Sequence, residues 1–365
     1  MLMLGTGGAA DGATLSRKKA IWGPAATNGI SNFPIYADLG VGIYQTAVSW
    51  RDVALTRPAD PTSPDDPAYA WPPEVDQAVR EAANLGMQVS LTLIRTPAWA
   101  NRGKEGKVPP SRPEDYADFA EAAARRWPSV RLWMVWGEPI RSVNFRVHPT
   151  GSPNFYVKPG ASPSAPSGFT LAQAAADRKY AQLVDAAYGR LKQRNRRNLI
   201  IGGNTTTSGD VDPFNWVRYM KLPGGRPPRM DLFGHNPFTS RKPDLKKDQI
   251  LRGTADFSDL DVYLPWVRRH LSRRGRNRGL KLFISEFTAP TDVESFEFPF
   301  HVTRKVQADW LTAGLKIVRK SRWIYSFGWI GLRDPAPAPD GAESRTGLID
   351  GKGRRKPAYR AFRRG

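Results

Sequence analysis

The chain has 365 residues, of which 40% are hydrophobic, and its 55 basic and 34 acidic side chains give a formal net charge of +21. This length and composition predict a globular protein of one large or two average domains and exclude an intrinsically disordered one. The absence of cysteine excludes disulfides, thiolate metal sites and cysteine nucleophiles, and no apolar run approaches the roughly 20 residues that a membrane span needs.

Strand-like and helix-like segments alternate along the chain. Short β-branched or aromatic runs ending in turn residues predict eight strands, at 18–24, 40–50, 88–95, 130–139, 198–204, 230–238, 280–287 and 323–332. Helical periodicity predicts eight helices, at 31–39, 74–85, 113–126, 171–194, 212–221, 259–273, 301–320 and 357–363. A polar cap before an early proline supports two of the helix starts, at Ser111 and Asp212.

This strict alternation favours a closed barrel over an open doubly wound sheet, because a barrel uses all the strands without leaving an edge. The sequence therefore predicts a single (β/α)₈ TIM barrel over 18–365, preceded by an N-terminal extension at 1–17. Two long loops, 55–72 and 141–170, follow the second and fourth strands. We expect both on the C-terminal face of the barrel, walling a substrate cleft.

Two glutamates end predicted strands in equivalent positions. Alternate residues from Leu132 to Glu138 share one face of the fourth strand, and alternate residues from Leu280 to Glu286 share one face of the seventh. We expect both faces to point into the barrel, so that each ends in a carboxylate at the C-terminal rim, where barrel enzymes carry catalytic residues. Two such carboxylates suit glycoside hydrolysis, one as a protonated acid and one ionised. Either glutamate alone could be a solvated strand end.

The local sequences around these glutamates resemble those of a known group. Trp136-Gly137-Glu138-Pro139 is similar to the Trp-Asn-Glu-Pro that ends strand four in clan A retaining glycoside hydrolases, and Ser285-Glu286-Phe287 is similar to their Ser/Thr-Glu-aromatic context on strand seven. This group of (β/α)₈ enzymes includes cellulases, β-xylosidases and α-L-arabinofuranosidases. The resemblance extends to His235, Trp329 and the closing GLIDGKGRRKPAYRAF, so that it covers about residues 18–364.

The resemblance implies that Glu138 is the acid/base, Glu286 the nucleophile and Trp329 a sugar platform. The chain departs from the pattern in two places. Gly137 replaces the asparagine that usually contacts the sugar 2-hydroxyl, and Asn236 follows His235 where the group often has a tyrosine that touches the nucleophile. These departures predict that sugar recognition differs from the usual pattern.

Further strand-top residues are candidates for binding substrate. Asn236, Asn204 and Arg95 could supply the lost polar contacts, and Arg51 or Arg95 could hold the nucleophile's charge or a sugar hydroxyl, with structural ion pairs as the alternative. The flat faces of Trp99, Trp136 and Trp329 suit a sugar ring, although core packing would equally explain a tryptophan. No histidine pair has metal-ligand spacing, so we expect neither a metal nor a cofactor.

The basic residues cluster at helix C-terminal ends and just before the following strands, which is the bottom of a barrel. Examples are KQRNRR at 192–197, RRHLSRRGRNRGLK at 268–281 and VRKSR at 318–322. The helix dipole favours cations at these ends, so a solvated structural role and electrostatic adhesion to an anionic polymer both stay open. A specific nucleic-acid partner is not expected, because an enzyme that acts on nucleic acid would carry its basic residues around the mouth of its active site.

The sequence thus predicts a retaining glycoside hydrolase that cleaves a polysaccharide or oligosaccharide, with a β-glucan or cellulose-like substrate first. The alternatives are an arabinofuranosidase or other pentosyl-specific glycosidase, a non-catalytic glycan-binding barrel, and a polyanion-binding protein of another function. We expect a monomer whose partner is carbohydrate. The start of the chain lacks the pattern of a signal peptide. The absence of cysteine fits the cytoplasm and many secreted bacterial proteins alike. We expect a secreted protein and leave a cytoplasmic one open.

Overall fold

The computed structural model describes residues 13–147, 174–247, 253–273, 275–295, 297–335 and 343–365. The first twelve residues of the expected N-terminal extension lie outside this part of the chain, as does most of the loop expected at 141–170. No helix of the described ranges combines the length and hydropathy that a membrane crossing requires.

Eight parallel strands form a closed barrel. They are β1 (Ser16–Trp22), β4 (Val41–Ser49), β5 (Gln88–Ile94), β6 (Leu132–Val135), β7 (Leu199–Thr206), β8 (Leu232–Asn236), β9 (Lys281–Phe287) and β10 (Ile324–Ile330). The ring closes because β1 pairs with β10 on one side and with β4 on the other. The predicted single (β/α)₈ barrel is therefore confirmed, and its first strand begins two residues before the expected boundary at 18.

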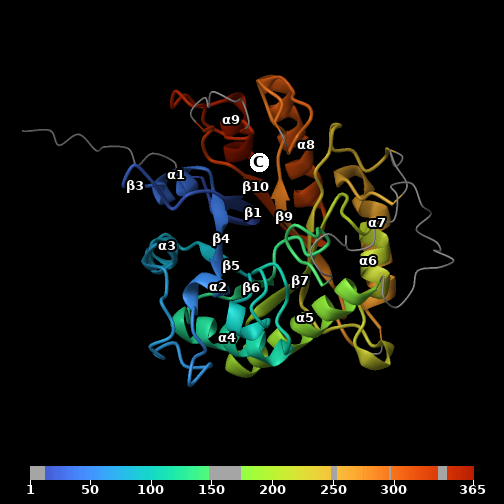
Figure 1. Ribbon diagram of the computed structural model, residues 1–365. Coiled ribbons are helices and arrows are strands. Elements are labelled where there is room, and N and C mark those ends of the chain that lie inside the picture. Colours follow the sequence, from blue (N-terminus) through green and yellow to red (C-terminus); the bar gives the residue numbers. More distant parts are fainter. Residues whose placement is uncertain (1–12, 148–173, 248–252, 274, 296, 336–342) are drawn as a thin grey trace, which may run out of the picture.

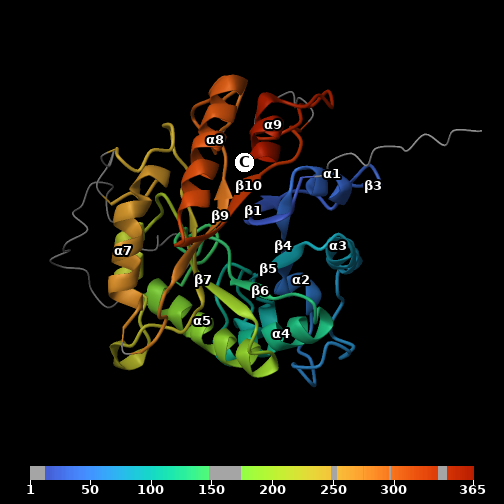
Figure 2. The same cartoon turned by 180° about the vertical axis from the view of Figure 1, so that it is seen from behind.

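Helices lie outside the strands in both views of the molecule (Figures 1 and 2). The main ones are α1 (Phe33–Asp38), α3 (Pro73–Asn84), α4 (Pro113–Arg126), α5 (Ala175–Arg194), α6 (Pro213–Tyr219), α7 (Leu260–Leu271), α8 (Arg304–Lys320) and α9 (Pro357–Arg364). The predicted cap at Asp212 is confirmed, since its side chain accepts a hydrogen bond from the Asn215 backbone. Short elements that the sequence did not predict are the β2–β3 hairpin (Ala26–Thr27 and Ile30–Ser31) and α2 (Trp50–Val53).

The barrel interior is filled by apolar side chains from strands all round the ring. These residues are Ala20, Ile43, Leu132, Met134, Ile201, Leu232 and Phe283. Because they come from six different strands, only inward-pointing side chains can meet in this way. The expected inward direction of Leu132 and Met134 on the fourth strand is thus confirmed.

The expected facing of the seventh strand is wrong. Leu280, Leu282 and Ile284 belong to the outer core that packs against the helices, and Phe283 takes the interior position instead. Every residue from 282 to 284 is apolar and buried, so alternation alone does not tell which face points inwards. The same ambiguity is typical of strands in parallel sheets that are covered on both sides.

A β-bulge near the end of β9 changes the facing just before Glu286. Phe327 of β10 pairs with Ile284, whereas Trp329, two residues on, pairs with Phe287, so β9 holds one extra residue. The extra residue shifts the alternation by one. As a result Glu286 faces the cavity at the rim although Ile284 faces outwards.

Polar contacts and a glycine hold the bulge. The Ser285 carbonyl oxygen accepts a hydrogen bond from Gln45 Nε2 at 2.8 Å, and the Ser285 hydroxyl accepts one from Trp22 Nε1 at 3.2 Å. On the other side, a Cβ at Gly328 would lie 1.9 Å from the Ser285 carbonyl oxygen, so only glycine fits there. Residues of β1, β4 and β10 therefore hold the bulge of β9 in place.

The interior position of Phe283 can be tested by truncation. We expect Phe283→Ala to lower the free energy of unfolding by about 3–5 kcal/mol, because it removes a ring from a filled interior and leaves a cavity. Lys281→Ala, at the exposed start of the same strand, should change it by less than about 0.5 kcal/mol. Urea denaturation measures both. A cost below about 1 kcal/mol for Phe283→Ala would contradict the interior placement.

Candidate active site

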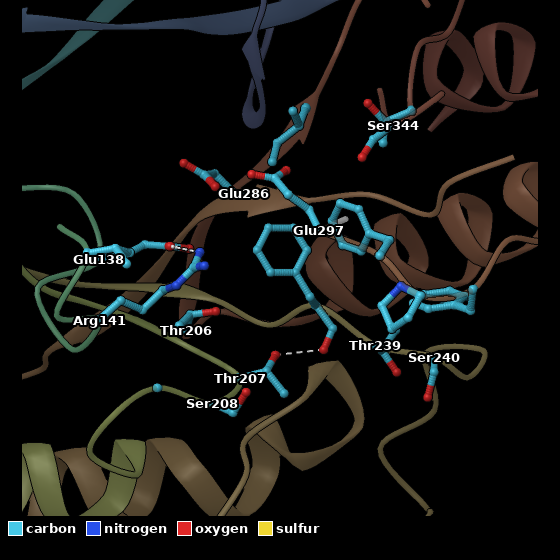
Figure 3. A pocket seen from close by; sticks show the side chains of 18 of the residues that line it. Glu138, Arg141, Thr206, Thr207, Ser208, Thr239, Ser240, Glu286, Glu297 and Ser344 are labelled. Atoms are coloured by element: carbon cyan, nitrogen blue, oxygen red, sulfur yellow. Dashed lines mark hydrogen bonds and ion pairs between the residues drawn. The ribbon is translucent and has the colours of Figure 1, made fainter. Parts of the chain in front are cut away.

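A cavity of about 770 Å³ opens at the C-terminal rim of the barrel, and both Glu138 and Glu286 line it (Figure 3). Its walls come from the segments that follow β6, β7, β8, β9 and β10, at 138–143, 206–210, 238–240, 297–300 and 344–346. The two predicted carboxylates therefore meet in one cavity. Their side chains project into the same space from different strands.

An irregular backbone delivers Glu138. β6 ends at Val135, and the next residues include Trp136 with φ 65° and Glu138 with φ 40°, values that side-chain-bearing residues seldom adopt. The turn sends Trp136 outwards, against the expectation that it continues the inward face. It leaves the Glu138 carboxylate 10% exposed, on the cavity wall.

Two hydrogen bonds fix the Glu138 carboxylate. Asn236 Nδ2 donates to Oε1 at 2.9 Å, and Arg141 Nη1 donates to Oε2 at 3.0 Å in an ion pair. Asn236 is fully buried at the end of β8, so its amide is a rigid donor. Each carboxylate oxygen thus has its own donor, one neutral and one charged.

Glu286 stands in a contrasting environment. Burial raises the pKa of its carboxyl well above the usual range, and the nearby carboxylates of Glu138 and Glu297 raise it further, while Arg141 opposes them. Ionising every carboxyl group around one cavity is unfavourable because the negative charges repel, so Glu286 tends to hold a proton. The two glutamates therefore differ in their surroundings, as a pair with two chemical roles requires.

The buried polar residues near the rim support the site from behind. The Asn204 side chain donates to the Trp136 carbonyl at 3.1 Å, which braces the turn that carries Glu138. His235 is fully buried between Thr205, whose hydroxyl lies 2.8 Å from Nδ1, and the Ala255 carbonyl, 2.9 Å from Nε2. Burial lowers the pKa of His235 to about 4, so its ring is neutral. Neither Asn204 nor His235 lines the cavity.

The two tryptophans at positions 136 and 329 are fully buried, so neither offers a flat face to a sugar, against expectation. Trp329 has no exposed surface, and its indole donates to the Thr346 carbonyl at 3.2 Å. Trp136 is 1% exposed and packs against Phe145. Trp99 is partly buried against Trp50. None of the three lines the cavity, and the Arg57 guanidinium lies over the Trp99 ring, 4.5 Å from its centroid.

The expected cleft wall at 55–72 and the two strand-top arginines also lie away from the cavity. Arg51 and Arg95 flank Gly106, where a Cβ would meet Arg51 Cδ at 3.0 Å and Arg95 Cβ at 3.5 Å. No residue of 55–72 lines the cavity. The cavity occupies the β6–β10 side of the rim, so side chains that follow β4 and β5 do not reach it.

Several lining residues were not predicted from the sequence. Arg141 is one, and an aromatic wall of Phe238, Phe298 and Phe300 is another. The Phe238 and Phe298 rings meet edge to face with centroids 5.4 Å apart, and Phe298 and Phe300 with centroids 6.2 Å apart. The run FEFPF at 296–300, just after the seventh strand, could have indicated this wall.

Hydroxyl groups line much of the remaining cavity. They belong to Ser142, Thr206, Thr207, Ser208, Thr239, Ser240, Ser344 and Thr346. The Thr207 hydroxyl already donates to the Phe238 carbonyl at 2.6 Å (Figure 3). A wall of aromatic faces and hydroxyls suits a polyhydroxylated ring. In the described part of the chain, no group of three His, Asp or Glu side chains is arranged to hold a metal ion.

Gly137 occupies an open position between Trp136 and Glu138. A Cβ built there would meet only Ile94 Cγ2, at an ordinary contact distance of 3.8 Å. The glycine is therefore not required by packing, in contrast to Gly328. The backbone at this position would therefore also accept a residue with a side chain.

Solved structures share this fold. A family 39 glycoside hydrolase from the gut symbiont Bacteroides cellulosilyticus WH2 superposes with a TM-score of 0.62 and 16% identity over 95% of this chain and 62% of its own. A glucosidase from Croceicoccus marinus superposes with a TM-score of 0.60 and 14% identity, over 96% of this chain and 66% of its own. A monomeric β-xylosidase from Caulobacter crescentus CB15 superposes with a TM-score of 0.56 and 16% identity, over 97% of this chain and 69% of its own. This chain thus spans about two thirds of the length of these proteins.

No sequence-family model matches the chain, and no curated protein sequence does so either. At 14–16% identity the likeness to the solved structures establishes the fold. The assignment of an activity depends on the cavity itself.

Gly137 and Gly328, which lie near the two rim glutamates, should respond differently to an added methyl group. We expect Gly137→Ala to change the free energy of unfolding by less than about 1 kcal/mol, because the added Cβ enters open space. Gly328→Ala should cost more than about 2 kcal/mol, because its Cβ would collide with the Ser285 carbonyl and displace the bulge. Thermal and urea unfolding of both variants test this. Equal effects of the two substitutions would contradict the described backbone at the rim.

Proposed function

We propose that this protein is a retaining glycoside hydrolase that acts through Glu138 and Glu286. The observation that carries the proposal is the meeting of these two glutamates in one cavity at the C-terminal rim of the barrel. The aromatic and hydroxyl lining supports a sugar ligand. The names of the solved structures with this fold, which include a β-xylosidase and a glucosidase, support the same class of reaction.

The proposed reaction has two steps. A Glu286 oxygen attacks the anomeric carbon while the bond to the leaving oxygen breaks, and Glu138 gives its proton to that oxygen. Glu138 then takes a proton from water, whose oxygen attacks the anomeric carbon and releases Glu286. Two inversions leave the product with the configuration of the substrate.

The surroundings of the pair add a condition to this mechanism. Burial and the neighbouring carboxylates raise the pKa of Glu286 and so favour a proton on it, whereas attack needs Glu286 ionised and Glu138 protonated. We propose that the proton passes to Glu138 as substrate enters and Arg141 leaves the Glu138 carboxylate. Arg141 is suited to move, since its side chain is 45% exposed while that of Glu138 is 10% exposed.

We propose a β-linked glucan or cellulose-like polysaccharide as the first substrate class, and a pentosyl linkage as the second. The open position at Gly137 favours the second class, because the site lacks the amide that would contact a 2-hydroxyl in the usual pattern. A panel of polysaccharides and aryl glycosides, hydrolysed by the wild type beside Glu286→Gln, distinguishes the classes. Binding without hydrolysis across the whole panel would favour a non-catalytic glycan-binding barrel.

The roles of the two glutamates can be separated with azide. We expect Glu286→Gly to lower kcat at least about 10⁴-fold, because no nucleophile remains. Azide should restore turnover and give a glycosyl azide of configuration opposite to the substrate. Glu138→Gly should give a glycosyl azide of retained configuration, because the intermediate on Glu286 still forms.

NMR of the wild-type reaction checks the same assignment, since the first anomer released should retain the substrate configuration. An inverted first product would contradict the nucleophile role of Glu286. Exchange of the two azide products between the variants would show that the glutamates have the opposite roles.

Removing the charge of Glu297 should change the pH profile. Glu297 is one of the carboxylates that raise the pKa of Glu286, so Glu297→Gln should lower that pKa. Glu286 must be ionised to attack, and the acidic limb of kcat/KM should therefore move to lower pH. Ser344→Ala, on the same cavity wall and uncharged, is the control and should leave the limb in place. A limb that stays unmoved in Glu297→Gln would argue against Glu286 as the titrating group.

A further inference from the structure

The edge of the barrel opposite the cavity carries a group of exposed cations, which we call the basal cationic face. Its members are Arg17, Arg269, Arg273, Arg278, Lys281, Arg319, Lys320 and Arg322. They belong to the starts of β1 and β9, the ends of α7 and α8, and the connections into β9 and β10. Because β1, β10 and β9 are neighbouring parallel strands, these positions share one edge, away from Glu138 and Glu286.

The chain segments that carry this face contain no acidic residue of their own, although Arg276, between two of the members, pairs with Asp185 from another element at 3.0 Å. The stretches 13–22, 266–281 and 310–325 have no aspartate or glutamate. Within the described ranges, none of the eight cations forms an ion pair with a carboxylate. Many other arginines of the chain are paired, for example Arg229 with Asp185 and Arg304 with Asp292. The eight cations of this face thus stand together without a carboxylate partner among the described residues.

The cations act against the folded state where they crowd together. Burial and the charge of Lys281 lower the pKa of Lys18, and burial and the charge of Arg319 lower the pKa of Lys19 to about 8. The helix dipole favours Arg269, Arg319 and Lys320 at helix ends, but it gives no reason for Lys281 at a strand start. The charges of Lys281 and Arg319 thus oppose those of the neighbouring buried lysines, with burial as the larger cause.

The surface chemistry of this face limits its partner. The side chains of Arg268 and Arg322 lie over the Trp323 ring, 3.5 and 4.6 Å from its centroid, so this aromatic is not free to stack on a nucleic-acid base. Of the large exposed apolar side chains of the described residues, only Leu85, just before β5, lies at this edge of the barrel, and one such side chain is too little to insert into a bilayer. Recognition at this face therefore depends on charge.

We propose that the basal cationic face binds an acidic polysaccharide, so that the protein is held on a polymer while its cavity faces outwards. Arginine donates to carboxylates in a bidentate geometry, and evenly spaced carboxylates along a polymer match a face of many cations. The choice of a polysaccharide over another polyanion rests on the proposed glycosidase function. The binding itself does not require activity.

The test uses polygalacturonate and a matched pair of variants. Arg269→Gln/Lys281→Gln/Arg319→Gln neutralises one cation on each of α7, β9 and α8. Its control, Arg80→Gln/Arg102→Gln/Lys104→Gln, removes the same net charge from exposed positions outside the face. Fully methyl-esterified polygalacturonate supplies the same backbone without charge.

We expect the wild type to bind polygalacturonate, more weakly as salt is added, and not to bind the ester. The basal variant should bind about tenfold more weakly, since it loses three exposed ion contacts, and the control variant should bind within about twofold of the wild type. Equal weakening of both variants, or wild-type binding to the ester, would overturn the proposal. Tighter binding to duplex DNA or to phosphatidylserine vesicles than to polygalacturonate would overturn the choice of a polysaccharide.

Two further readouts separate this proposal from the others. The basal variant should hydrolyse a small soluble glycoside like the wild type, because its substitutions lie far from the cavity, whereas Glu286→Gln should bind polygalacturonate normally. A single cooperative thermal transition and a wild-type circular dichroism spectrum show that the basal variant is folded. Failure of the glycosidase activity and failure of the binding face would thus appear in different measurements.

Discussion

The site depends on one close approach between two strands, the contact of the Ser285 carbonyl with the backbone of Gly328. A side chain at Gly328 would fall 1.9 Å from that oxygen. The missing Cβ lets β9 bulge towards β10, and Gln45 and Trp22 fasten the bulge from two other strands. Because the bulge shifts the strand alternation by one residue, Glu286 reaches the cavity. A regular strand would have carried it to the face of Ile284, among the helices.

The partner glutamate is delivered in a related way. Trp136, Glu138 and Asn204 all have positive φ at the rim, and the Asn204 side chain braces the turn between the other two. Strained backbone of this kind persists where surrounding contacts over-determine it, and it is concentrated at functional sites. Both carboxylates thus stand where regular strand geometry ends. Their environments then diverge, since Glu138 has two donors while Glu286 faces other carboxylates.

The barrel and the two rim glutamates could be predicted from the sequence because both depend on local patterns, namely the alternation of elements and a carboxylate at each strand end. The facing of the seventh strand could not, because Leu282 and Phe283 are equally apolar and a bulge leaves no mark in composition. The tryptophan platforms failed for a similar reason. A large ring such as Trp329 fits a core or a cavity, and only the position of the helices decides which. Arg141 was not predicted either, because its ion pair with Glu138 depends on the irregular turn that carries both residues.

The basal cationic face lies at the end of the barrel axis opposite the cavity, so its positive charge is set off-centre. A charged face of this kind experiences a torque near a boundary of opposite charge, within a distance set by a Debye length of about 8 Å at physiological salt. Beside a negatively charged surface the protein would turn its cations inward before making any contact. The barrel itself would then act as the orienting device, and the cavity would meet its ligand from the solution side.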